Sequence, residues 1–288
     1  MTTEIDPVLA EALASLVDED ASGPTELRIK LLSAARRPFV PIRHTFVQQP
    51  RSAETRAAKL SELVRARNRR ALDTTLLVYA LEPILGGTPL PNSTWARLLS
   101  GEKGPAVPVT AVSKTWGLLE DDYRLVERGR RLHKLADVRP LREDGSGEPY
   151  IRPGRVAKGT TGYFILPHTY WSDGWDQTLT LPAKAMLLVY LSATQKTPTL
   201  CMSYEQADAW YGLSERTAER GIRELRNASL LGEHGQKVAE ARSATGSTIR
   251  YHRFLLGEFS THSRQALQQK TSAETRGRLG RAARQEST

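Results

Sequence analysis

Residues 202–231, MSYEQADAWYGLSERTAERGIRELRNASLL, decide how the chain folds. Ser203 and Ser214 are typical N-cap residues, because a serine oxygen can accept a hydrogen bond from a backbone N–H in the first turn of a helix. Each is followed by apolar residues at helical spacing, and Gly212 between them allows a tight turn. The stretch therefore predicts a helix from Ser203 to Tyr211, a turn, and a second helix from Ser214 to Arg226.

The helix that begins at Ser214 has two different faces. Its apolar residues keep helical spacing on one side, where they can pack against a core. The other side is polar and basic, and arginine suits bidentate contact with guanine edges and with phosphate. The residues that we expect to contact a nucleic acid are Ser214, Glu215, Arg216, Thr217, Arg220 and Arg223. The alternative is that Arg220 and Arg223 only pair with Glu219 and Glu224 on a solvated helix face.

The flanking sequence supplies a helix before this stretch and a hairpin after it. Pro182–Ala193 is mostly apolar and begins with proline, which suits the first turn of a helix. After Leu231, Gly232–Gly235 predicts a turn into a hairpin with strands at Lys237–Ala241 and Ile249–Leu256. Such a hairpin can lie along a DNA backbone, and its expected contact residues are Arg242, Thr245 and Arg250.

In this order of elements, Leu181–Leu256 resembles the winged helix-turn-helix superfamily, which includes bacterial transcription regulators and plasmid or phage replication proteins. The resemblance rests on the helix, the tight turn, the serine-capped helix, Leu230-Leu231 and the hairpin, and it covers about a quarter of the 288 residues. It implies binding of double-stranded DNA, with the Ser214 helix in the major groove, and often dimerisation. It matches no single named family and supplies no target sequence.

The apolar stretch that opens this unit occurs twice. Leu76–Leu81 reads LLVYAL and Leu187–Leu191 reads LLVYL, and each is followed by a proline-containing turn, a tryptophan and an amphipathic helix. The period of roughly 100–115 residues is longer than that of solenoid repeats. The sequence therefore predicts two similar domains.

The first copy departs from the pattern. Its second helix is expected at Asn92–Leu99 and its third at Val109–Arg130, after a Gly/Pro-rich insertion at Gly101–Pro108. The third helix carries the acidic residues Glu120–Asp122, so dimerisation or packing against the other unit is an equal alternative to DNA contact. Its candidate DNA contacts are Thr110, Ser113, Lys114 and Thr115.

The sequence as a whole predicts a mainly α-helical protein with small β-hairpin wings, built from tandem winged helix-turn-helix domains. A further helix is expected from Ser52, and the arginines at its far end, 65–70, suit either the helix dipole or a phosphate-contacting arm. The expected division is an acidic segment (1–26), a basic helical segment (27–70), a first winged-helix-like domain (71–151), a linker (152–178), a second winged helix-turn-helix domain (179–256) and a basic tail, disordered or a loosely attached helix (257–288).

Charge and hydropathy restrict the partners and the location. The chain has 41 Lys and Arg against 32 Asp and Glu, a net charge of +9, which favours anionic partners such as nucleic acid. No apolar run approaches the roughly 20 residues that span a bilayer, and residues 1–20 are acidic where a signal peptide is basic. We therefore expect a cytoplasmic, nucleoid-associated protein without a membrane partner.

Motifs for catalysis and metal binding are missing from the sequence. The single cysteine, Cys201, allows neither an internal disulfide nor a cysteine-based metal cluster. The six histidines lack metal-ligand spacing, and Gly101–Gly104 lacks the order of a phosphate-binding loop. We therefore expect a protein that is not an enzyme, with no catalytic residue, no metal site and no cofactor.

Three functions stay open at this point. The leading hypothesis is a transcriptional regulator that reads double-stranded DNA with residues 214–226, alone or as a homodimer. The second is a non-enzymatic replication initiator or partition protein of a plasmid, phage or integrated element, which would also contact replication proteins. A transcriptional regulator of the first kind would also contact transcription proteins. The third is a scaffold whose winged fold binds protein instead of DNA.

Overall fold

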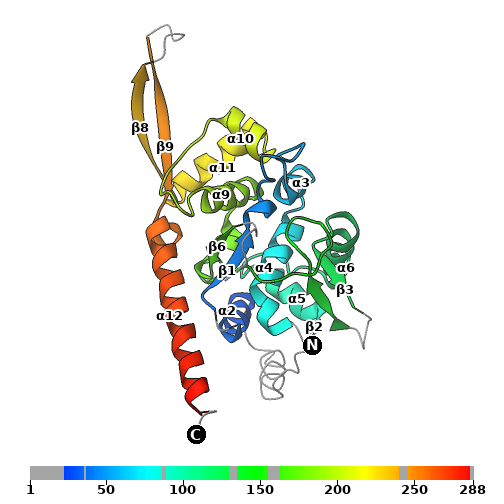
Figure 1. Ribbon diagram of the computed structural model, residues 1–288. Coiled ribbons are helices and arrows are strands. Elements are labelled where there is room, and N and C mark those ends of the chain that lie inside the picture. The colour runs from blue at the N-terminus through cyan, green and yellow to red at the C-terminus, as the bar shows by residue number, and fades with distance from the viewer. Residues whose placement is uncertain are drawn as a thin grey trace.

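The computed structural model describes residues 23–35, 37–85, 89–129, 135–154, 162–239 and 246–285. Helices dominate it, and the strands form small antiparallel sheets of two or three strands. This arrangement confirms the prediction of a mainly helical protein with small hairpins. The body is made of packed helices, from which the hairpin β8–β9 projects (Figure 1).

The basic N-terminal segment contains a strand as well as helices. Its elements are α2 (Pro24–Ala34), β1 (Phe39–Arg43), η1 (His44–Phe46) and α3 (Lys59–Arg65). The helix expected from Ser52 therefore begins only at Lys59, after an irregular stretch. α3 buries Leu60 and Leu63, as its apolar spacing predicts.

The first repeated unit has the expected second helix but a shorter third one. Its elements are α4 (Arg69–Leu85), β2 (Leu90–Pro91), α5 (Asn92–Leu99), α6 (Val109–Gly117), η2 (Leu118–Asp122), β3 (Val126–Arg128), β4 (Leu135–Ala136) and β5 (Val138–Pro140). Arg124 has a φ of 54°, which lies in the left-handed region and ends the helix. The prediction of a helix to Arg130 was wrong, because the chain turns there into β3, whose Val126 is buried.

The second unit follows the predicted order closely. Its elements are α9 (Leu181–Ala193), β7 (Leu200–Cys201), α10 (Tyr204–Tyr211), α11 (Glu215–Asn227), β8 (Leu231–Ala239) and β9 (Ser247–Leu255). Gly232–Gly235, expected as a turn, lies within β8, because each of these residues pairs with one between Tyr251 and Phe254 in β9. The hairpin is therefore longer than predicted, and its tip, 240–245, lies outside the described residues.

The two units pair their strands in a similar way. In the second unit β9 lies between β7 and β8 in one sheet. In the first unit β4 pairs with β2 and β5 pairs with β3 in two separate sheets, and only Asp137 separates β4 from β5. In each unit the last stretch of strand therefore pairs with both earlier strands, which agrees with the repeat seen in the sequence.

Residues 163–178 of the expected linker, 152–178, are built into the core. β6 (Tyr163–Pro167) pairs antiparallel with β1, and it leads into the short helices α7 (Thr169–Ser172) and α8 (Trp175–Thr178). Tyr170 and Trp171 are buried, and one apolar cluster contains residues of both repeated units. The described residues of this segment therefore hold the two units together.

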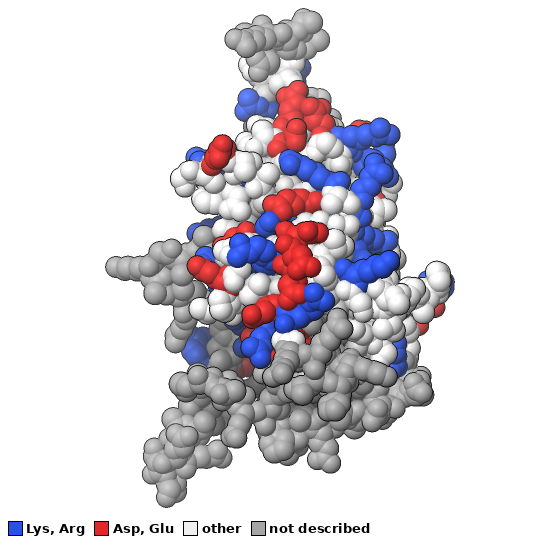
Figure 2. All heavy atoms as spheres, turned by 90° about the vertical axis from the view of Figure 1, so that its right-hand side faces the viewer, with Lys and Arg blue, Asp and Glu red and all other residues white. Residues whose placement is uncertain are grey.

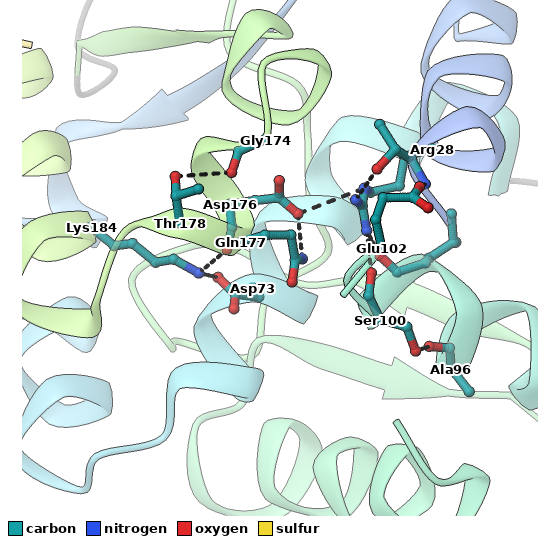
Figure 3. A network of polar contacts seen from close by, with 12 residues as sticks. Arg28, Asp73, Ala96, Ser100, Glu102, Gly174, Asp176, Gln177, Thr178 and Lys184 are labelled. Carbon is teal, nitrogen blue, oxygen red and sulfur yellow. Dashed lines mark hydrogen bonds and ion pairs between the residues drawn. The ribbon is translucent and has the colours of Figure 1, made fainter. Parts of the chain in front are cut away.

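A buried network of charges joins four helices (Figure 3). Lys184 of α9 donates hydrogen bonds to the Asp73 carboxylate of α4 and to the carbonyl oxygen of Asp176 in α8. Arg28 of α2 lies 3.6 Å from the Asp176 carboxylate and donates to the carbonyl oxygens of Leu98 (2.9 Å) and Ser100 (2.7 Å). Burial lowers the pKa of Lys184 and raises that of Asp176, and the opposite charge beside each group counteracts the shift.

The C-terminal segment is a helix over residues 261–285, so of the two expected alternatives the helix is confirmed and disorder was wrong for these residues. α12 (Thr261–Gln285) follows a short turn, η3 (Gly257–Phe259), and runs along the side of the body in Figure 1. The Arg264 side chain is buried and donates to the carbonyl oxygens of Leu191 (3.0 Å) and Thr194 (2.9 Å) at the end of α9. It thus satisfies carbonyls that the end of α9 leaves unpaired.

Among the described helices, none combines the length and the apolar character that crossing a membrane requires.

The close crossing of α11 and α9 predicts that Gly221→Ala destabilises the fold. An added Cβ would lie 2.4 Å from the Pro182 carbonyl oxygen and 2.6 Å from Met186 Cγ, so the helices must separate. We expect a loss of about 1–3 kcal/mol in the free energy of unfolding, measured by urea denaturation. Gly277→Ala in α12, where a Cβ meets nothing within 4 Å, is the control and should be neutral or slightly stabilising.

The buried network predicts that removing one charge strongly destabilises the fold and that removing its partner as well restores much of the stability. Asp73→Leu leaves Lys184 buried beside one carbonyl oxygen, and we expect a loss of about 3–5 kcal/mol in the free energy of unfolding. The double variant Asp73→Leu, Lys184→Met should recover at least half of it. Glu62→Leu, which breaks the exposed pair with Lys59 (2.7 Å), is the control and should cost under about 1 kcal/mol. Equal losses in all three would contradict the role of the network.

His168 predicts a loss of stability in mild acid. Burial lowers its pKa from 6.5 to about 4, and its Nε2 has no hydrogen-bond partner among the described residues. Between these two values the unfolded chain binds the proton and the folded chain does not, so stability must fall as the pH falls through this window, by at most about 1.4 kcal/mol per pH unit. His168→Phe should flatten the profile of unfolding free energy against pH.

Candidate nucleic-acid interface

Local interactions fix α11 in place. Ser203 and Gln206 form a capping box at the start of α10, and Gly212 ends that helix with a φ of 65°. Ser214 Oγ then accepts a hydrogen bond from the backbone N–H of Thr217 (3.3 Å), which caps α11. The two predicted caps and the predicted tight turn are thus confirmed, and they set the direction in which the first turn of α11 points.

The two faces of α11 differ as the sequence predicts. Ala218, Ile222 and Leu225 are buried, and the side that carries Gly221 packs on α9. The opposite side is open to solvent. Its exposed residues are Ser214, Glu215, Arg216, Arg220 and Arg223, and Thr217 is half-buried.

The arginines of α11 differ in what they contact. Arg223 lies 3.7 Å from Glu219, one turn away, and Arg226 lies 3.0 Å from Glu233 of β8. Within the described part of the chain, Arg216 and Arg220 form no ion pair. Their guanidinium groups are therefore available to an external anion.

Glu224 does not pair with Arg220. Its carboxylate accepts hydrogen bonds from the backbone N–H (2.7 Å) and the hydroxyl of Thr180, and so it caps α9. The alternative that both arginines only form surface pairs therefore holds for Arg223 and not for Arg220.

The basic end of α3 lies next to the start of α11, which the sequence did not predict. Arg65, at the end of α3, donates to the carbonyl oxygen of Gly212 (3.2 Å), and Gln48 donates to that of Trp210 (2.8 Å). Exposed Arg65 therefore lies beside the turn that precedes α11. The sequence predicts that the arginines at 65–70 could contact phosphate, but not that this segment packs beside the turn before α11.

The hairpin supplies one described candidate of the three that were predicted from it. Arg250 is exposed on β9, opposite Gln236 of β8, and forms no ion pair with another described residue. Arg242 and Thr245 lie outside the described residues.

The candidates of the first unit do not form one exposed group. Thr110 and Lys114 are exposed on α6, and Ser113 is half-buried, with its hydroxyl 3.3 Å from Asn92 Nδ2. Thr115 is buried and donates to the carbonyl oxygen of Ala111 (2.8 Å), so it is out of reach of a ligand. Spacing alone could not distinguish the exposed candidates from the buried one, because the packing of α6 decides that Thr115 faces the core.

Charge is segregated on the molecular surface. Figure 2 shows acidic side chains in a column along the middle of one face and basic side chains gathered along one edge of it. A surface that separates the two signs of charge can orient an anionic partner.

No side-chain group for metal binding is found in the described ranges, taking groups of three or more His, Cys, Asp or Glu residues.

Comparisons of the chain with family models, with curated proteins and with solved structures found no match.

Proposed function

We propose that the protein binds specific sequences in double-stranded DNA through the winged helix-turn-helix unit 179–256, with α11 in the major groove. The observation that carries this proposal is the pair of exposed arginines, Arg216 and Arg220, at the start of a capped helix whose other face is packed. In winged helix-turn-helix proteins the N-terminal residues of the corresponding helix contact base edges.

The surroundings of α11 also suit a duplex. Arg65 lies beside the turn before the helix, and Arg250 lies on the projecting hairpin. Contacts of this kind bind phosphates and fix the register of a protein on DNA without reading sequence. These two basic positions therefore support affinity, whereas specificity rests on α11.

Regulation of transcription is the role that we favour. The candidate reading helix α11 belongs to the second unit. In the first unit the acidic residues Glu120–Asp122 lie in η2, which follows α6 directly, so that unit is better suited to packing or to protein contacts. A replication initiator is the second candidate, and the similar strand pairing of the two units favours it, because tandem winged helices are typical of such initiators.

Substitution of the two arginines tests the proposal. Arg216→Ala and Arg220→Ala should each weaken binding to a sequence selected from a genomic-fragment library, by about 1–3 kcal/mol where the arginine reads a base. Arg226→Ala is the matched control, because Arg226 lies on the same helix but pairs with Glu233. Binding would be measured by fluorescence anisotropy with the full chain.

Salt dependence separates the alternatives. If an arginine contacts only phosphate, its loss should weaken binding to all sequences alike and reduce the slope of log affinity against log salt by about 1. Binding of a protein partner with no affinity for any duplex would contradict the proposal and favour the scaffold.

A further inference from the structure

A cavity of about 660 Å³ lies between β9 and the start of α10, at the base of the projecting hairpin. Its volume falls within the range of about 300–1,000 Å³ that ligand sites occupy. Three of the six large apolar side chains that the described surface exposes, Tyr204, Ile249 and Tyr251, line this one cavity. Exposed aromatic rings gathered around a hollow indicate a binding surface.

A buried arginine holds the two rings in place. The Arg253 guanidinium lies 5.9 Å from the centre of the Tyr204 ring and 5.6 Å from that of Tyr251. It is fixed by Glu233 (3.2 Å) and by the carbonyl oxygen of Met202 (3.1 Å), and its side chain is almost fully buried. The rings thus rest on a rigid cation and keep surface free for stacking.

The open side of β9 leaves room for a ligand beside these rings. β7 pairs only with His252 and Arg253, so the described chain does not pair with β9 at Ile249 to Tyr251 on that side. Exposed Lys237 lies opposite Ile249 on the neighbouring strand, and exposed Arg250 lines the cavity. Neither cation forms an ion pair with another described residue, so the cavity and the strand beside it carry positive charge that is available to a ligand.

We propose that this cavity binds an unpaired nucleobase of single-stranded DNA, with Tyr204 and Tyr251 stacking on the base and Arg250 and Lys237 contacting the flanking phosphates. Aromatic side chains beside cations bind single strands in this way, because every base presents a π face. The site adds a single-stranded ligand to the duplex binding proposed above, and its biological role depends on that proposed function. It favours a role in which the bound duplex opens, as at an origin of replication.

Binding to oligo(dT) of about 16 nucleotides, the upper end of the usual site size, tests the inference with the full-length protein. Tyr251→Ala and Tyr204→Ala should each weaken binding by about 5- to 100-fold in fluorescence anisotropy, whereas Tyr251→Phe should retain it. Both alanine variants should bind the selected duplex as the wild-type protein does, since α11 is unchanged. Arg220→Ala should behave in the opposite way, losing the duplex and keeping oligo(dT).

The single cysteine gives a second readout. Cys201 is half-buried and lines the cavity, so its alkylation rate reports whether the cavity is occupied. Oligo(dT) should slow alkylation in the wild-type protein and not in Tyr251→Ala. Protection by free thymidine monophosphate as strong as that by oligo(dT) would identify a mononucleotide site and overturn the single-strand assignment.

The outcomes distinguish this inference from the proposed function. Wild-type affinity for oligo(dT) in both alanine variants, or no binding of oligo(dT) by the wild-type protein, overturns the base site and leaves duplex binding untouched. Loss of duplex binding with tyrosine-dependent binding of oligo(dT) overturns the proposed function alone. Circular dichroism of each variant shows that the fold is retained.

Discussion

The pairing of Lys184 with Asp73 joins the first helices of the two repeated units inside the core. Each charge would be costly to bury alone, and removing either would leave the other without compensation. Arg28 and Asp176 extend the same network to α2 and α8, so four helices share one set of charges (Figure 3). The relative positions of the two units therefore depend on this network and on the β1–β6 pair beside it.

That constraint bears on how the protein would meet DNA. Because β6, α7 and α8 are part of the core, the second unit is held against the first and cannot swing on an exposed tether. Arg65 reaches Gly212 from the N-terminal segment, so the surface around α11 is assembled from residues about 147 positions apart in the chain. A duplex on α11 would contact this composite surface.

The base site proposed at the hairpin and the duplex site proposed at α11 share Arg250 as a phosphate contact and otherwise use different residues of the same unit. The duplex site relies on Arg216 and Arg220, which form no ion pair with another described residue. The base site relies on tyrosines beside Arg253, which pairs with Glu233. A regulator needs only the first site. A replication initiator that also holds a melted strand needs both sites. Binding at both sites would therefore favour an initiator over a transcription regulator.

Local sequence was sufficient to predict α10 and α11 of the second unit and α5 of the first, because caps, apolar spacing and Gly212 act over a few residues. α10 and α11 begin at the predicted caps, and Asn92–Leu99 is α5. How these helices meet depends on the tertiary structure. The end of α6, the burial of Thr115, the strand β6 in the expected linker and the cavity beside Tyr251 all depend on contacts between distant segments. Local patterns contain no information on such contacts, since any helix of the right spacing could pack on several partners.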